Sequence, residues 1–378
     1  MKICFVCHEY PPVVHGGIGT FVESFAQGLA AVGHSVVVVG MGAAEAERND
    51  HGVHVVTLPR PRRKAGVSWF LERRQLYHYL RAEARRAAFE IIEVPDFAGW
   101  LPAAFPDCRV AVRLHQTATN IAMSDYFLPH PATWMCERRT LQIHRHWIAP
   151  SAHILRFTTK RFGIEPLKAA IIPHPILVEN NLDLACPVPD RFVLFAGTLT
   201  AHKGAFLLAR AARGFLASCC DLHMVYAGKI TTGGGISADK AILDIVGERL
   251  APRVHFLGHL PHPAILTLMA RATVFVLPSL LESFGLAAAE AMAQGCPVIL
   301  SDIPPFRELV QHARTGLLFN PTSIDVIARA VAQLYEDDEL RTRLGEAGRR
   351  AIQATCSMPR AIEHTIEFYS TIRTATRQ

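Results

Sequence analysis

The chain opens with a change from one hydrophobic pattern to another. Residues 2–7 form a short apolar run with β-branched members, which is typical of a buried strand. After a loop with two prolines and several glycines, apolar residues recur at helical spacing over residues 20–32. Residues 35–39 are then almost continuously apolar, as in a parallel strand buried on both faces. This order of strand, helix and strand predicts a βαβ unit.

The same alternation of strand-like and helix-like segments continues to about residue 300. Buried-type strands are predicted in the first half at residues 53–57, 91–94, 110–114, 147–149 and 170–172. A second series is predicted at residues 192–196, 223–227, 254–257, 274–277 and 298–300. Between the two series, residues 174–191 are rich in proline, asparagine and aspartate and lack periodicity, which indicates a linker.

The pattern predicts an α/β protein with two doubly wound domains, residues 1–180 and residues 190–360. A last helix over about residues 361–378 follows the second domain and could pack back on the first. Such sheets bind ligands at the carboxyl ends of their strands, so the expected ligand site is a cleft between the domains.

Composition narrows the class of protein. The 378 residues are 50% hydrophobic and 19% charged, which suits large packed cores and excludes a disordered chain. The formal net charge is only +6, and no basic tail indicates a nucleic-acid partner. The nine cysteines are scattered, which indicates reduced thiols. The apolar run at the start is too short for a signal peptide, and no uncharged apolar run is long enough to span a membrane. We therefore expect a soluble cytoplasmic protein, at most docked on a membrane.

Glycines cluster between the first strand and the first helix. Gly16 and Gly17 stand where backbone N–H groups and the helix dipole favour a phosphate. The stretch is not the GxGxxG pattern, and no acidic residue follows at the place that holds a dinucleotide ribose. A phosphate site and a flexible turn both fit these residues.

A second polar loop follows the predicted strand at residues 274–277. Glu282 precedes an alanine-rich helix that carries Glu290. At a rise of 1.5 Å per residue the two lie roughly 12 Å apart, too far for the carboxylate pair of a glycoside hydrolase, which is about 5 to 9.5 Å. An unpaired carboxylate on an apolar helix is costly, so a ligand contact is favoured over a solvated Glu290.

Several blocks together resemble one enzyme family. They are HEYPPVVHGGIGTFVESFAQGLAAVGH, FAGTLTAHKG, VHFLGHL, VLPSLLESFGLAAAEAMAQGCPVILSD and TGLLFNP, in this order as far as about residue 321. They resemble the retaining nucleotide-sugar glycosyltransferases of family 4. The resemblance implies a GT-B fold, two Rossmann-like domains facing each other across a deep cleft. It implies an enzyme that moves a hexosyl or N-acetylhexosaminyl group from a UDP- or GDP-sugar to a glycan, lipid-linked or small-molecule hydroxyl, with no metal.

The resemblance also assigns roles to residues. Gly16 and Gly17 would line the donor diphosphate, and Lys203 would neutralise it. Glu282 would bind hydroxyls of the donor sugar and Glu290 those of the ribose. The remaining implied contacts are the backbone N–H groups of Phe284, Gly285 and Leu286, and His115, which matches the family's histidine near the donor sugar. The family's proposed route uses the leaving phosphate as base, which agrees with the absence of an obvious nucleophile in the sequence.

One position departs from the family. Thr198 occupies the place where the family usually has an arginine of the diphosphate clamp. Either His202 or Lys229 compensates for the missing charge, or the diphosphate binds more weakly.

Alternatives remain at two levels. A phosphorylase or synthase acting on a disaccharide or glucan would share the fold, and a non-catalytic sugar-nucleotide-binding protein is a rival from another class. The basic and aromatic segment of residues 60–74 could lie on an anionic membrane or touch an acceptor, although a surface loop with a packed aromatic anchor is favoured.

Overall fold

The computed structural model describes residues 1–13, 16–61, 67–86, 88–124, 128–176, 188–321 and 323–374. The chain divides into two compact units, Met1–Pro175 with Met358–Gln378 and Ile176–Ser357. Each unit is a mainly parallel, doubly wound α/β sheet, so the predicted fold class is confirmed. Most of the predicted linker, residues 177–187, lies outside the described residues.

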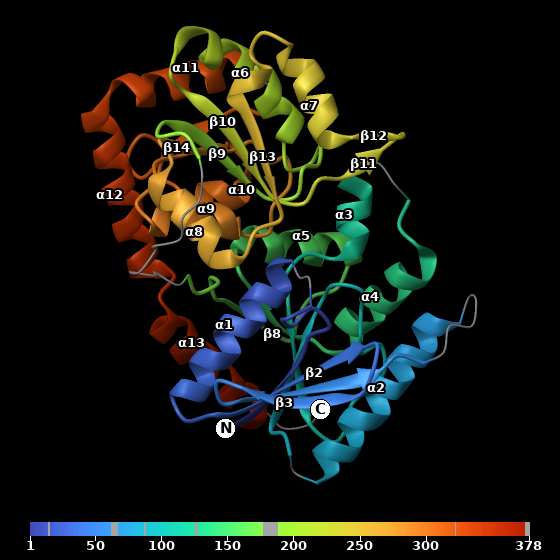
Figure 1. The fold of residues 1–378 in the computed structure, drawn as a ribbon. Helices are drawn as coiled ribbons and strands as arrows, with labels where there is room; N and C mark the ends of the chain where they lie inside the picture. The colour runs from blue at the N-terminus through green and yellow to red at the C-terminus, as the bar shows by residue number, and fades with distance from the viewer. Residues whose placement is uncertain are drawn as a thin grey trace. The chain divides into compact units, whose positions relative to one another are not determined.

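The first unit is built on a sheet with the strand order β3-β4-β2-β1-β5-β6-β7-β8. Its strands are β1 (Lys2–Val6), β2 (Ser35–Gly42), β3 (Ala46–Asp50), β4 (Val53–Pro59), β5 (Ile91–Pro95), β6 (Arg109–Arg113), β7 (His146–Ala149) and β8 (Lys168–Ile171). Only β3 pairs antiparallel, with β4. The helices of this unit are α1 (Gly17–Ala31), α2 (Ser68–Arg85), α3 (Ala118–Ser124), α4 (Pro131–Ile143), α5 (Ala152–Phe162) and α13 (Met358–Thr374), labelled in Figure 1.

The second unit has the strand order β13-β10-β9-β14-β15-β16. Its strands are β9 (Phe192–Ala196), β10 (His223–Ala227), β13 (Val254–Gly258), β14 (Val274–Leu277), β15 (Val298–Ser301) and β16 (Leu317–Phe319), and a hairpin joins β11 (Thr232–Gly233) to β12 (Ile236–Ser237). The helices are α6 (Ala205–Ser218), α7 (Ala238–Val246), α8 (His262–Arg271), α9 (Leu286–Ala293), α10 (Pro304–Leu309), α11 (Ile324–Glu336) and α12 (Asp338–Thr355), with a 3-10 turn η1 (Ala251–Arg253). All six strands of the large sheet run parallel.

Two local predictions were wrong in detail. The strand predicted at residues 170–172 as buried is β8, whose residues are mostly exposed because it lies at the sheet edge and pairs only with β7. The first helix begins at Gly17, three residues before the predicted start. Gly17 therefore belongs to the first turn of α1, and Gly16 is the residue that caps it.

The last helix, α13, belongs to the first unit. Its Tyr369 is fully buried and donates a hydrogen bond to Glu93 on β5. Glu93 in turn accepts two hydrogen bonds from Arg113 on β6, at 2.7 and 2.9 Å. A buried charge needs such a partner, since one left alone destabilises the fold by several kcal/mol, about 3 to 5. The chain thus returns to its first sheet after completing the second.

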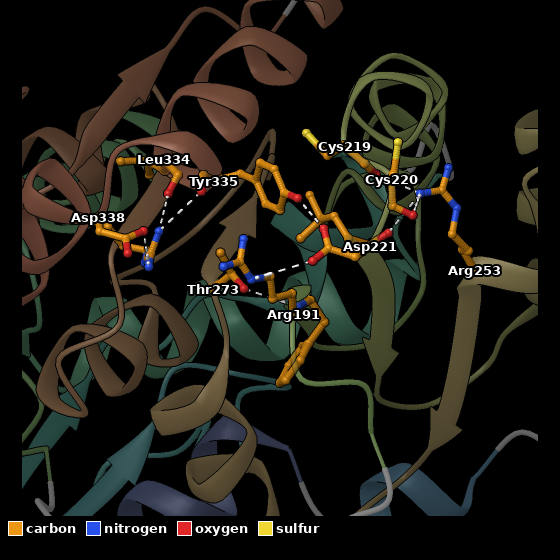
Figure 2. Close-up of polar contacts among 12 residues, drawn as sticks. Arg191, Cys219, Cys220, Asp221, Arg253, Thr273, Leu334, Tyr335 and Asp338 are labelled. Atoms are coloured by element: carbon orange, nitrogen blue, oxygen red, sulfur yellow. Dashed lines mark hydrogen bonds and ion pairs between the residues drawn. The ribbon is translucent and has the colours of Figure 1, made fainter.

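A polar network at the amino ends of β9 and β10 is shown in Figure 2. Asp221 accepts a hydrogen bond from the hydroxyl of Tyr335 and lies 3.7 Å from Nε of Arg191. Arg253 donates to the carbonyls of Cys219 and Cys220 at 2.7 and 3.0 Å. These contacts join α11 and the chain before β13 to the edge of the sheet opposite its ligand-binding end, so their role is structural.

The cysteines described by the structure are free thiols, and all but Cys220 are buried. Burial raises the pKa of Cys7 to about 12, which keeps its thiol protonated and suits packing on a strand. No helix among the described residues is both long and apolar enough to cross a bilayer.

Candidate active site

Two turns at the carboxyl ends of neighbouring strands carry the predicted donor contacts of the second unit. Lys203 lies in the turn after β9, and Glu282 in the turn after β14. Their side chains form an ion pair, with Nζ of Lys203 donating to Oε1 of Glu282 at 2.8 Å. Ser279 donates to the same oxygen at 2.9 Å. The side chain of Glu282 is only 7% exposed, whereas that of Lys203 is 30% exposed.

Backbone geometry fixes the two turns against each other. Gly204 has φ 77°, and a Cβ at this position would stand 2.0 Å from the carbonyl oxygen of Pro278. Only glycine fits that close approach. A second tie is the amide of Leu280, which donates to the carbonyl of His202 at 2.7 Å. The pair of Lys203 and Glu282 therefore stands on a rigid support.

Both oxygen atoms of Glu282 matter for its chemistry. Lys203 and Ser279 bond to Oε1, and within the described residues no hydrogen bond goes to Oε2. One oxygen is thus held in place while the other remains available as an acceptor. This arrangement suits recognition of a sugar hydroxyl by a preoriented carboxylate.

Glu290 on α9 has a partner that the sequence did not indicate. Its Oε1 lies 2.9 Å from Nε2 of His262, the first residue of α8. The premise that this carboxylate is unpaired was therefore wrong, and its ligand role rests on its position alone. Its Oε2 makes no hydrogen bond within the described part of the chain, so the same division between a held and an available oxygen recurs here.

The start of α9 is shaped by a glycine. Gly285 caps the helix with φ 90°, and a Cβ there would meet the ring of Phe306 at 2.4 Å. Phe284 is buried, whereas Leu286 is half-buried. The N–H groups at this helix start, where the dipole is positive, remain the predicted contacts for the donor sugar or phosphate.

The position of the missing arginine lies beside two other candidate cations. Thr198 is half-buried in the turn after β9. The amide of the next residue, Leu199, donates to the carbonyl of Lys229 at 2.9 Å, and the side chain of Lys229 is exposed. His202 lies in the same turn, with Nε2 3.4 Å from the hydroxyl of Thr200. The structure thus brings the backbone of Lys229 beside the residue after Thr198 and leaves both candidates open.

In the first unit, Gly16 and Gly17 lie at the start of α1. The amide of Gly16 donates to Oε2 of Glu9 at 3.2 Å. That carboxylate occupies one of the N–H groups predicted to face a diphosphate, so a phosphate would have to displace it or bind beside it. Whether these two glycines bind the donor stays a prediction.

His115 lies two residues after the end of β6, and its loop is held by a buried carboxylate. Asp96, fully buried after β5, accepts the amides of His115 at 2.8 Å and Gln116 at 3.3 Å. Burial, followed by the charge of Arg113, lowers the pKa of His115 to about 3. The imidazole is therefore neutral at ordinary pH and suited to hydrogen bonding with a sugar hydroxyl rather than to pairing with the diphosphate charge.

The carboxylates behind this loop were missed by the sequence reasoning. Glu137 on α4 is fully buried and accepts the amides of Ala98, Ala118 and Thr119 at 3.0, 2.7 and 3.2 Å. Burial, opposed in part by the hydrogen bond from the backbone amide of His115, raises the pKa of Asp96 to about 7. Burial also raises the pKa of Glu137. An acidic residue directly after a buried strand, as in the sequence of Asp96, was the available signal.

The segment at residues 60–74 is only partly described, since residues 62–66 lie outside the described ranges. Phe70 is half exposed near the start of α2. Arg73 is buried and donates to the carbonyls of Trp69, Ala98 and Gly99. One basic residue of the segment is thus buried while the aromatic Phe70 is half exposed, so the packed anchor, the membrane contact and the acceptor contact all stay predictions.

Comparison with known proteins identifies the enzyme class of this chain. The chain matches the family models described as Glycosyltransferase Family 4 over residues 15–180 and Glycosyl transferases group 1 over residues 183–351. Together with two Rossmann-like units, these matches define an enzyme of the GT-B glycosyltransferase class. The chain belongs to glycosyltransferase family 4, as the resemblance predicted.

Two full-length relatives support this assignment. A glycogen synthase of Mycobacterium tuberculosis is 25% identical, with 100% of this chain and 96% of the relative covered. The alpha-maltose-1-phosphate synthase of Mycolicibacterium smegmatis is 30% identical, with 98% and 99% covered.

Solved structures agree on the fold. The sucrose-phosphate synthase from Thermosynechococcus elongatus superposes with a TM-score of 0.77 at 20% identity, covering 99% of each chain. The Anabaena protein HepE in complex with UDP-glucose superposes with a TM-score of 0.73 at 18% identity, covering 98% of this chain and 100% of that one. At these identities the likeness shows the GT-B fold.

Proposed function

We propose that this glycosyltransferase transfers a sugar from a nucleoside diphosphate sugar to an acceptor hydroxyl with retention of configuration. The observation that carries the proposal is the joined pair of Lys203 and Glu282 at the carboxyl ends of β9 and β14. A cation and a carboxylate with one available oxygen, set 2.8 Å apart, match a donor with an anionic diphosphate next to a hydroxyl-rich sugar.

Each group then has a distinct part in the reaction. As the bond from the sugar to the diphosphate breaks, negative charge grows on the leaving phosphate, and Lys203 stabilises it. Glu282 and Glu290 use their available oxygens to hold hydroxyls of the donor sugar and ribose. The neutral imidazole of His115 bonds to the donor sugar, and the leaving phosphate accepts the proton of the acceptor hydroxyl. The helix start and Lys203 supply the positive charge, so the reaction proceeds without a metal.

A UDP-sugar is the first donor to test, because a UDP-glucose complex is known for the structurally similar HepE. The test is incubation of the purified protein with UDP-, GDP- and ADP-sugars and a panel of acceptors, with nucleotide release as the readout. Release that depends on an acceptor supports the proposal, and the anomeric configuration of the product by NMR tests retention. Parallel reactions with EDTA test the absence of a metal requirement.

Two outcomes would point elsewhere. Tight nucleotide-sugar binding without turnover for any acceptor would favour a binding protein. Release of sugar 1-phosphate from a disaccharide or glucan in the presence of inorganic phosphate would favour a phosphorylase.

A further inference from the structure

A second cluster of positive and aromatic side chains lies in the first unit, apart from the residues given roles above. It gathers where the adjacent strands β4, β2, β1 and β5 end. Arg60 follows β4, His8 follows β1 and Trp100 follows β5, while Arg73 comes from α2. The rings of His8 and Trp100 have centroids 3.6 Å apart, and the guanidinium of Arg73 lies 4.7 Å from the Trp100 ring.

The hydrogen bonds of His8 define its tautomer. Its Nδ1 accepts the amide of Met41 at 2.9 Å, so the ring proton must be on Nε2. The pKa of His8 is lowered to about 3 by burial and then by the charges of Arg60 and Arg73, so the ring stays neutral. Nε2 is buried and has no hydrogen-bond partner within the described residues. A buried donor without an acceptor destabilises the structure, and an acceptor atom on a ligand would relieve this cost.

The charge of Arg73 is not neutralised by direct contact. It is 8% exposed, its three hydrogen bonds go to backbone carbonyls, and it forms no ion pair within the described ranges. The carboxylates near enough to affect its pKa are Glu72 and Glu137, and the oxygens of Glu137 are occupied by backbone amides.

Arg60 provides the accessible charge of the cluster. Its side chain is exposed, it lies close enough to His8 to influence that ring, and it too forms no ion pair in the part of the chain that the structure describes. An exposed and a buried guanidinium, both acting on the His8 ring, are a source of positive potential at a ligand-binding edge of the sheet.

We propose that this cluster binds a phosphate group carried by the acceptor, so that the acceptor is a phosphorylated sugar or polyol. The proposal rests on the proposed transferase function and names its acceptor class. Arg60 contacts the phosphate, Arg73 adds charge from behind, and the N–H of His8 offers a neutral donor. Guanidinium groups suit phosphate because they present paired donors. Two similar proteins, alpha-maltose-1-phosphate synthase and sucrose-phosphate synthase, are named for phosphorylated sugars.

The experiment compares matched acceptors in the nucleotide-release assay: glucose with glucose 1-phosphate and glucose 6-phosphate, fructose with fructose 6-phosphate, and inositol with inositol 3-phosphate. We expect at least one phosphorylated member to be used with kcat/KM about tenfold or more above its neutral counterpart, since a charge-assisted hydrogen bond contributes about 1.5 to 3 kcal/mol. Inorganic phosphate should compete with that acceptor and not with the donor. A neutral sugar used as well as its phosphate would overturn the proposal.

Variants locate the site. Arg60→Gln should raise the KM for the phosphorylated acceptor about 10-fold to 100-fold and leave the donor KM unchanged. Arg74→Gln, an exposed arginine on α2, is the matched control and should change neither. An unchanged acceptor KM in Arg60→Gln would refute the assignment.

Direct binding separates this proposal from the transferase function. If no donor gives nucleotide release, calorimetric titration of each acceptor pair decides the matter without turnover. Tighter binding of a phosphorylated member, lost in Arg60→Gln, supports the phosphate site although the transferase proposal has failed. Equal binding of all pairs, or none, refutes it.

Discussion

Replacing Lys203 with methionine removes the only charge of that side chain while keeping much of its length. The substitution has two separable consequences. It leaves Glu282, 7% exposed, without its cation, and it removes the charge proposed to stabilise the departing diphosphate. The first lowers the stability of the second unit, and the second lowers the rate.

The structural loss is limited by solvent. At 2.8 Å and an effective dielectric constant of 20, the gross attraction in the pair is about 6 kcal/mol. Desolvation offsets most of it, and Lys203 is 30% exposed, so the expected loss is below the roughly 3 to 5 kcal/mol of a fully buried pair. We expect about 1 to 2 kcal/mol, which lowers Tm by about 2 to 8 °C in a domain of this size.

The catalytic loss is larger. Removal of one group that stabilises charge in a transition state costs about 10²-fold to 10³-fold in kcat. Lys203→Met should therefore lower kcat/KM by about 10² or more, and Lys203→Arg should recover part of it because the charge returns. Thermal unfolding and steady-state nucleotide release measure the two effects independently. Lys240→Met, an exposed lysine on α7, serves as the control.

The catalytic role is refuted if folded Lys203→Met retains kcat/KM within about threefold of the wild type, because removing a charge that stabilises the transition state should cause a larger loss. In that case Lys203 would serve only to neutralise Glu282. A fall in Tm with unchanged activity is the signature of that purely structural role.

Three further predictions concern other parts of the protein. Glu290→Gln should weaken donor binding by about tenfold or more with kcat changed little, because a ribose contact exists in both ground and transition states; a large fall in kcat at unchanged KM would contradict this role. Thr198→Arg should tighten binding of the free nucleoside diphosphate by about 1.5 to 3 kcal/mol in a calorimetric titration. Equal affinities would mean that another cation fills the place, and Lys229→Ala in both backgrounds would show whether it is that one. Asp96, with its pKa raised to about 7, favours the folded state when protonated, so its contribution to the free energy of unfolding falls as pH rises from its unfolded value near 4 to about 7. Asp96→Asn should remove that part of the pH dependence in urea unfolding at pH 5 and pH 7, and an unchanged difference between the two pH values would disprove it.

The sequence by itself determined the enzyme family and most strands of the two large sheets, but not the short strands β3 and β16. Strands such as β9 and β14 are continuous apolar runs, a pattern that local residues set without help from distant ones. The turns after β9 and β14 contain Gly204 and Gly285, where a side chain would collide with the Pro278 backbone and the Phe306 ring. Only glycine fits there, so the motifs can be recognised in the sequence. The same sequence motifs contain Lys203, Glu282 and Glu290, the predicted donor contacts.

Only the tertiary structure decided which groups act on one another. Lys203 and Glu282 are 79 residues apart and meet because β9 and β14 are neighbours in the sheet, an order that strand patterns do not reveal. His262 reaches Glu290 from another helix in the same way. A much longer link joins Tyr369 to Glu93 over 276 residues and holds the last helix in the first unit. Periodicity records which face of an element is buried, whereas the partner of a buried charge depends on how distant elements pack, so these pairings follow only from the fold.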